Sequence, residues 1–184
     1  MTGAASMLGV LQSLVIQFAA FETVLLLASG LHKMLRRERS QAAVRELAGV
    51  PHRLAPFAVV AVAAAELLAG LLLWMPSYRV AGGTLAVLIW GGYLALILRA
   101  IGRGRRDVDC GCSFGPTQRP LGAYHVARNG VLTGVAVLVT AAFAAGASGP
   151  VLASQILAAS VLFALYGALD QVMALMPPRS GELL

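Results

Sequence analysis

The sequence has 184 residues, of which 59% are hydrophobic and 12% charged, with a mean hydropathy of +0.81 and a formal net charge of +6. Soluble domains carry about 25% charged and about 45–50% apolar residues, so this composition excludes an ordinary soluble enzyme, a disordered chain and a disulfide-rich secreted domain. The positive charge is confined to a few loops between apolar segments, which argues against nucleic acid as a partner and indicates an integral protein of the lipid bilayer.

Five apolar segments are predicted to be membrane-spanning helices, because each exceeds the roughly 20 residues needed to cross about 30 Å of hydrocarbon. Proline explains several of the breaks: Pro51 and Pro56 bracket the entry to the second span, and Pro76 follows it. We therefore expect an all-α polytopic transmembrane helical bundle over residues 1–184, a single membrane domain with a four-helix core plus a fifth span. The predicted spans are residues 8–31, 54–75, 80–101, 121–145 and 151–175.

The basic residues predict how the chain is oriented. Of the 14 Lys and Arg residues, only Arg79 falls on the side of the membrane that carries the turn between the second and third spans. The positive-inside rule therefore places the loops 32–53 and 102–120 and the carboxyl terminus in the cytoplasm, and the amino terminus outside.

Three acidic residues, Glu22, Glu66 and Asp170, fall inside predicted spans. A carboxylate in hydrocarbon is costly, so it is usually protonated, paired or turned toward a polar cavity. For Glu66 two interpretations remain open, namely a proton relay or quinone contact, and a buried hydrogen bond between helices. For Glu22 and Asp170 the structural interpretation is favoured. Asp170 is placed to pair with Arg128, since both fall near the cytoplasmic ends of their spans.

The loop after the third span contains the sequence Cys110-Gly111-Cys112. Glycine between the cysteines permits the backbone angles that a ring closed over one residue requires. Such a disulfide is strained, and strained disulfides have more oxidising potentials, which favours a redox use. Arg106 and Arg128 lie nearby in the sequence, and neighbouring cations favour the reactive thiolate.

Three other interpretations stay open. Two thiolates at this spacing are suited to a soft metal such as copper, zinc or mercury, which would make the chain a metal carrier or transporter. Tetrahedral coordination would need two further ligands, and His125 is the nearest imidazole in the sequence. The thiols could also be unreactive. Finally, the chain could be a non-catalytic subunit of a larger membrane complex, packed through glycines such as Gly83, Gly91 and Gly134.

The fourth span opens with an unusual density of polar groups, Tyr124-His125-Val126-Ala127-Arg128-Asn129. Arg128 keeps its charge, so its guanidinium must reach the interface, meet a carboxylate or face the cysteine loop. Snorkelling at a helix end also explains it. In the same way, a basic flank is one interpretation of His32 and Lys33 at the end of the first span.

Four segments together resemble the methylamine-utilisation protein E (MauE) and DoxX-like group of redox-associated membrane proteins. They cover most of residues 24–145. The combination of Cys-Gly-Cys with a later Arg-Asn is the most specific feature. The segments are Ser29-Gly30-Leu31-His32-Lys33, Ala65-Glu66-Leu67-Leu68-Ala69-Gly70, Cys110-Gly111-Cys112-Ser113-Phe114-Gly115 and Arg128-Asn129-Gly130-Val131-Leu132.

The resemblance implies a multi-pass protein of the bacterial cytoplasmic (inner) membrane that supports disulfide or other redox maturation of partner proteins, as a thiol–disulfide oxidoreductase or as part of a larger membrane complex. A thioredoxin-like or other redox protein is the implied partner. The architecture is also similar to the four-helix DsbB and vitamin K epoxide reductase type, which makes a quinone the candidate cofactor. Carried over by position, the candidate catalytic residues are Cys110, Cys112, Glu66 and Arg128, and the candidate cofactor-binding residues are Lys33, His32, Asn129 and His125.

This implication meets a difficulty in the predicted topology. Oxidative folding takes place outside the cytoplasm, whereas the charge distribution places Cys110 and Cys112 inside. Either the loop re-enters the bundle, or the pair takes electrons from a cytosolic thiol and passes them across the membrane. The strength of the charge bias favours a pair held at the cytoplasmic side of the bundle.

Overall fold

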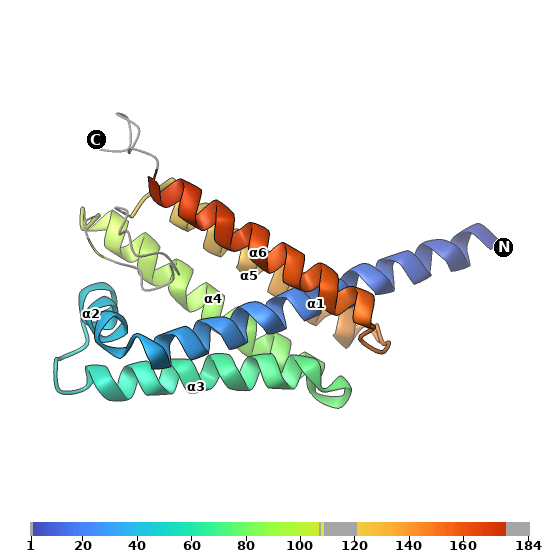
Figure 1. The fold of residues 1–184 in the computed structure, drawn as a ribbon, viewed down its shortest axis with the longest axis horizontal. Helices are drawn as coiled ribbons and strands as arrows, with labels where there is room; N and C mark the ends of the chain where they lie inside the picture. The colour runs from blue at the N-terminus through green and yellow to red at the C-terminus, as the bar shows by residue number, and fades with distance from the viewer. Residues whose placement is uncertain (1, 107, 109–120, 176–184) are drawn as a thin grey trace.

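The computed structural model describes residues 2–106, 108 and 121–175, so the predicted redox pair, Cys110 and Cys112, lies outside the described residues. All regular structure in the described part of the chain is helical (Figure 1). The elements are α1 (Thr2–Leu35), α2 (Arg37–Ala48), α3 (Ala55–Trp74), the short 3-10 helix η1 (Pro76–Tyr78), α4 (Arg79–Gly102), α5 (Ala123–Ala144) and α6 (Ala153–Leu175).

Five segments are long and apolar enough to cross a membrane, and they overlap the five predicted spans. They comprise Met7–Leu35 of α1, α3, η1 with α4, α5, and Ala153–Met173 of α6. The chain is therefore an all-α, multi-pass membrane protein, as the sequence predicted, and the lipid bilayer is its environment.

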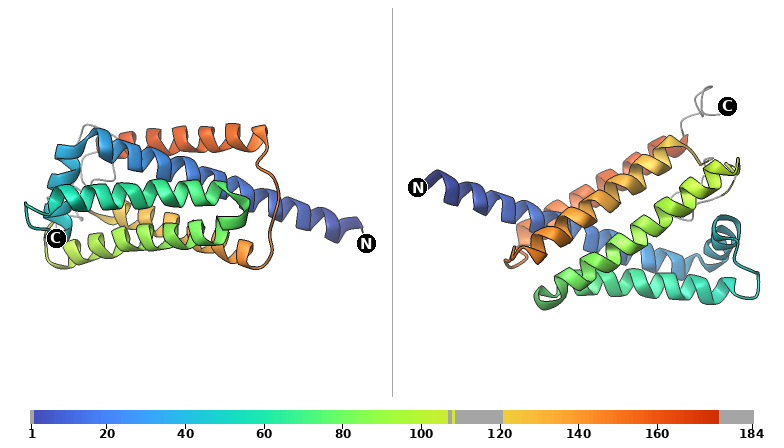
Figure 2. Two further views of the ribbon diagram at one scale, coloured as in Figure 1. Left: turned by 90° about the horizontal axis from the view of Figure 1, so that it is seen from below. Right: turned by 180° about the vertical axis from the view of Figure 1, so that it is seen from behind.

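Four of the helices form the core of the bundle. α1 packs along α3 and α4 packs along α5, while α3 against α4 joins the two pairs. α6 packs on the outside of α1, and the N-terminal part of α1 extends beyond the other helices (Figure 2). The centre is filled by apolar side chains such as Leu25 and Leu26 of α1, Trp90 of α4 and Leu132 of α5.

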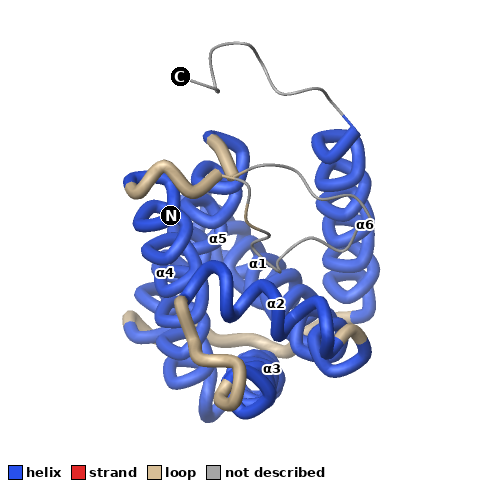
Figure 3. Tube along the Cα trace, turned by 90° about the vertical axis from the view of Figure 1, so that its left-hand side faces the viewer, coloured by secondary structure: helices blue, strands red, loops and turns tan. Residues whose placement is uncertain are grey.

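The segment 32–53, predicted as a cytoplasmic loop, is largely helical. α1 continues to Leu35, and α2 then crosses the end of the bundle in front of α1 (Figure 3). Ser40, Ala43 and Leu47 recur every three or four residues and are buried, so α2 is amphipathic and packs on α3. Gly49 ends the helix with φ 71°, a left-handed conformation that glycine adopts without steric cost.

The residues on either side of the cysteine segment are anchored at this same end of the bundle. Val108 and Leu121 are both buried, in one apolar cluster with Leu47 of α2 and Ile97 of α4. The backbone N–H of Leu121 donates a hydrogen bond of 2.6 Å to the carbonyl of Arg106. The two ends of the segment therefore start from neighbouring positions beside α2.

Candidate functional site

Glu66, near the middle of α3, is the centre of a buried polar cluster. Its side chain is 0% exposed, and Oε1 accepts three hydrogen bonds: from Ser29 Oγ (3.1 Å), Lys33 Nζ (2.8 Å) and Tyr93 OH (2.6 Å). Glu66 Oε2 has no hydrogen-bond partner within the described residues. Helices α1, α3 and α4 thus meet at one carboxylate, which we call the Glu66 cluster (Ser29, Lys33, Glu66 and Tyr93).

Lys33 is a member of this cluster rather than a basic flank. It lies one helical turn after Ser29, so both side chains share one face of α1. Its ammonium donates to Ser29 Oγ at 2.8 Å and also lies 5.3 Å from the centroid of the Tyr93 ring. Lys33 is 6% exposed, so the Lys33–Glu66 ion pair is buried on both sides. The interpretation of Lys33 as a flanking charge is therefore wrong, because its ammonium turns inward to a carboxylate.

Helix α4 also donates a hydrogen bond to a second buried carboxylate, that of Glu22 in α1. Trp90 Nε1 donates a hydrogen bond of 2.7 Å to Glu22 Oε2, and Glu22 is fully buried. Trp90 and Tyr93 are three residues apart, with ring centroids separated by 6.0 Å. Helix α4 therefore supplies one donor to a carboxylate of α1 and one to a carboxylate of α3. Glu22 makes the interhelical hydrogen bond that a structural role predicts.

Arg128 and Asp170 form the ion pair that the sequence predicted. Arg128 Nη1 lies 2.7 Å from Asp170 Oδ1, and both side chains are buried. Tyr124 OH donates to the same oxygen at 3.2 Å, and the Arg128 guanidinium lies 5.9 Å from the centroid of the Tyr124 ring. The pair joins α5 to α6 near the end of the bundle that carries α2.

His125 and Asn129 both lie on the buried side of α5. Asn129 Nδ2 donates to the carbonyl of His125, one turn earlier, at 2.9 Å, so this hydrogen bond lies within α5. His32, in the last turn of α1, is partly buried. Among the four candidate cofactor-binding residues, Lys33 lines a cavity between helices.

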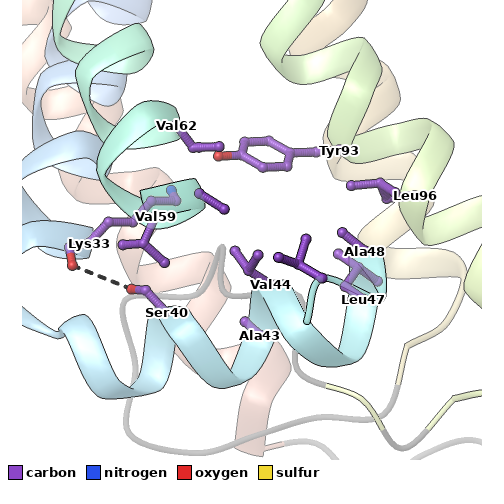
Figure 4. Close-up of a pocket in the computed structure, with 12 residues that line it drawn as sticks. Lys33, Ser40, Ala43, Val44, Leu47, Ala48, Val59, Val62, Tyr93 and Leu96 are labelled. Atoms are coloured by element: carbon purple, nitrogen blue, oxygen red, sulfur yellow. Dashed lines mark hydrogen bonds between the residues drawn. The ribbon is translucent and has the colours of Figure 1, made fainter. Parts of the chain in front are cut away.

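That cavity, of about 160 Å³, is bounded by α1, α2, α3 and α4 (Figure 4). Its wall is mostly aliphatic, and includes Val44 and Leu47 of α2 and Val59 of α3. Three residues with polar side chains, Lys33, Ser40 and Tyr93, also line it. The Glu66 cluster therefore has one side turned toward an apolar space large enough for a small molecule.

Sequence reasoning missed Tyr93 and Trp90 as partners of the buried carboxylates. The available signal was their spacing, because two aromatic residues with polar tips three positions apart lie on one face of a span, and buried tips need partners. Within the described residues, no group of three or more His, Cys, Asp or Glu side chains is placed to hold a metal ion.

The chain matches the model of a known protein family. The family model described as methylamine utilisation protein MauE matches residues 11–142. These residues include the whole Glu66 cluster, Arg128 and both cysteines, whereas Asp170 lies beyond them. No curated protein and no solved structure matches the chain.

Proposed function

This chain belongs to the MauE family of membrane proteins, and from that premise we propose that it is a thiol–disulfide redox protein whose redox pair is Cys110 and Cys112. We place it in the bacterial cytoplasmic membrane, with the amino terminus outside and the carboxyl terminus in the cytoplasm. The observation that carries the proposal is the anchoring of the residues that flank the pair, at the end of the bundle where the charged side chains of Lys33 and Arg128 are buried.

The described residues that flank the pair are anchored to the bundle. Cys110 follows the buried Val108 by two residues, and consecutive Cα atoms are about 3.8 Å apart. The backbone hydrogen bond from Leu121 to Arg106 ties the far end of the segment to its beginning. Arginine close to a cysteine favours the thiolate, which is the nucleophile in disulfide exchange. These features support a reactive pair held close to the bundle.

The proposed reaction transfers two electrons. A dithiol of a thioredoxin-like or other redox partner reduces the Cys110–Cys112 disulfide: the partner gives up two electrons and two protons and forms its own disulfide, and the chain gains both thiols. The chain then passes two electrons and two protons to a membrane-soluble acceptor, for which we propose a quinone, which becomes a quinol, and the Cys110–Cys112 disulfide forms again. The charge distribution of the loops supports a cytosolic partner dithiol.

We propose that Glu66 and Arg128 act through their charges rather than as electron carriers. Each belongs to a buried ion pair, Lys33–Glu66 or Arg128–Asp170. Buried pairs keep their charges in fixed positions, and such fixed charges influence thiolate formation nearby. We propose that the two pairs act as fixed dipoles within the bundle and that their orientation favours thiolate formation in the redox step.

The experiment is a thiol-alkylation gel shift on the full chain in membranes. Because the chain contains only two cysteines, the number of bound alkylating groups reports directly on the pair. We expect two groups after reduction and none after oxidation by a quinone. Cys110→Ser and Cys112→Ser should each bind one group under both conditions, and Ser113→Ala is the control expected to match the unaltered chain. Two reactive thiols after every oxidising treatment would overturn the proposal.

A further inference from the structure

The cavity beside the Glu66 cluster has the size and the lining of a ligand site. An apolar protein cavity of about 150 Å³ holds one benzene ring, and this one measures about 160 Å³. Val44, Leu47, Val59 and Leu96 contribute aliphatic wall from three different helices (Figure 4). Its volume and its aliphatic lining therefore suit one small apolar ring.

The polar groups of the wall differ in the hydrogens they have left to donate. The Tyr93 hydroxyl donates to Glu66 Oε1. The Ser40 hydroxyl donates to the backbone carbonyls of Lys33 and, at 3.0 Å, of Arg36. The Lys33 ammonium carries three hydrogens, and two of them are used by Ser29 and Glu66. Within the part of the chain that the structure describes, the third hydrogen of Lys33 has no hydrogen-bond acceptor, and Lys33 belongs to the cavity lining.

The charge of the cluster selects the kind of acceptor. Lys33 and Glu66 form a buried pair whose charges cancel. A carboxylate or phosphate brought into the cavity would add an uncompensated negative charge close to Glu66, which is unfavourable away from water. A neutral carbonyl oxygen accepts the hydrogen bond without adding charge. The cluster therefore favours a neutral ligand over an anionic one.

We propose that this cavity binds a neutral, membrane-soluble ring compound through a carbonyl oxygen that accepts a hydrogen bond from Lys33 Nζ. The binding follows from the cavity and its lining. The redox role of the ligand rests on the proposed function: within this chemical class, a quinone is the compound that accepts two electrons from a dithiol. The acceptor of the proposed reaction would then bind between α1, α2, α3 and α4.

Tryptophan fluorescence measures this binding. The chain has two tryptophans, and Trp74→Phe leaves Trp90, which lies 6.0 Å from the Tyr93 ring of the cavity wall. A short-chain benzoquinone added to this variant in lipid nanodiscs should quench Trp90 saturably. Decanoate, an apolar chain that ends in a carboxylate, should not displace the benzoquinone. Displacement by decanoate at similar concentrations would show that the site takes carboxylates and would overturn the proposed class.

Variants that fill the cavity test whether the ligand binds there. Ala48→Phe puts a ring into the space from α2, and Ala58→Leu narrows it from α3, without altering Lys33 or Glu66. Each should weaken benzoquinone binding at least tenfold. Ala42→Phe, at a partly buried position of α2 outside the cavity lining, is the matched control and should bind normally. Unchanged saturable quenching in both filled variants, or quenching that never saturates in the unfilled chain, would overturn the proposal.

The same measurement in a Cys110→Ser/Cys112→Ser chain separates this inference from the proposed function. The described residues that line the cavity all belong to α1, α2, α3, α4 and the turn after α2, so binding should persist in this chain. Binding that persists while the unaltered chain never forms a disulfide would contradict the redox proposal alone. Absence of binding together with a normal alkylation shift would contradict the cavity proposal alone.

Discussion

Three donors from two helices converge on one oxygen of Glu66, and one of them is the cation Lys33. Removing one partner of a buried ion pair leaves the other charge without compensation, which costs about 3–5 kcal/mol in soluble proteins. Glu66→Gln and Lys33→Met should therefore each lower the free energy of unfolding by about 3 kcal/mol. The double variant should lose less than the sum, since no lone charge remains.

Reversible unfolding of the purified protein in mixed micelles measures these changes as a double-mutant cycle. Glu38→Gln, which removes an exposed carboxylate from α2, is the control and should change stability by less than about 0.5 kcal/mol. Additive losses from the two buried positions would contradict the ion pair as the source of the effect.

The ion pairs also show what could be predicted from single residues. Arg128 and Asp170 were expected to pair because both carry a charge near the same end of their spans, and the structure places them 2.7 Å apart. Lys33 stands next to a run of arginines, so its sequence context resembles a cytoplasmic flank. Its burial depends on α1 continuing to Leu35 and on Glu66 facing it from α3, and neither is visible locally.

At the scale of elements, the glycines of α4 differ in how closely they pack against neighbouring helices. A Cβ added at Gly82 would lie 2.5 Å from the backbone nitrogen of Leu73, whereas one added at Gly92 meets nothing within 4 Å. Gly82→Ala should therefore push α4 away from the end of α3 and cost about 1–3 kcal/mol, because backbone cannot move aside as a side chain can. Gly92→Ala should be neutral or stabilise the helix by up to about 1 kcal/mol.

Both variants carry the same change from glycine to alanine, so their thermal unfolding in the same detergent compares the two positions directly. Equal melting temperatures would contradict the close packing of α3 and α4 at Gly82. Small-residue patterns alone did not distinguish these positions. Gly130 and Gly134 have the same spacing as known packing motifs, yet a Cβ at either one meets nothing within 4 Å.

The helices themselves follow from hydropathy, since each span needs about 20 apolar residues and proline or glycine marks several of the turns. α2 does not follow in the same way. Arg37–Ala48 is short and highly charged, so its composition is that of a loop. Only its three-to-four-residue spacing of Ser40, Ala43 and Leu47 indicates a helix, and its place over the cavity is set by tertiary packing against α3.

For the whole molecule, the five spans allow only two orientations of the chain in the membrane. The turn at η1 and the residues between α5 and α6 must share one side, and α2, the cysteine segment and the end of α6 must share the other. Of the 14 basic residues, only Arg79 belongs to the first side, and its Nη1 is bonded to the carbonyl of Gly149 at 2.9 Å. We therefore expect the second side to be cytoplasmic.

Reporter fusions and cysteine accessibility test this orientation. Green fluorescent protein fused after Leu184 should fluoresce, and alkaline phosphatase fused there should be inactive. In a chain lacking Cys110 and Cys112, a single cysteine at exposed Ser77 should react with a membrane-impermeant maleimide in intact cells, and one at exposed Arg53 should react only after the membrane is opened. The reverse pattern would place the cysteine segment outside the cytoplasm. The donor of the proposed reaction would then have to be an extracytoplasmic dithiol, while the cavity beside Lys33 would keep its proposed ligand.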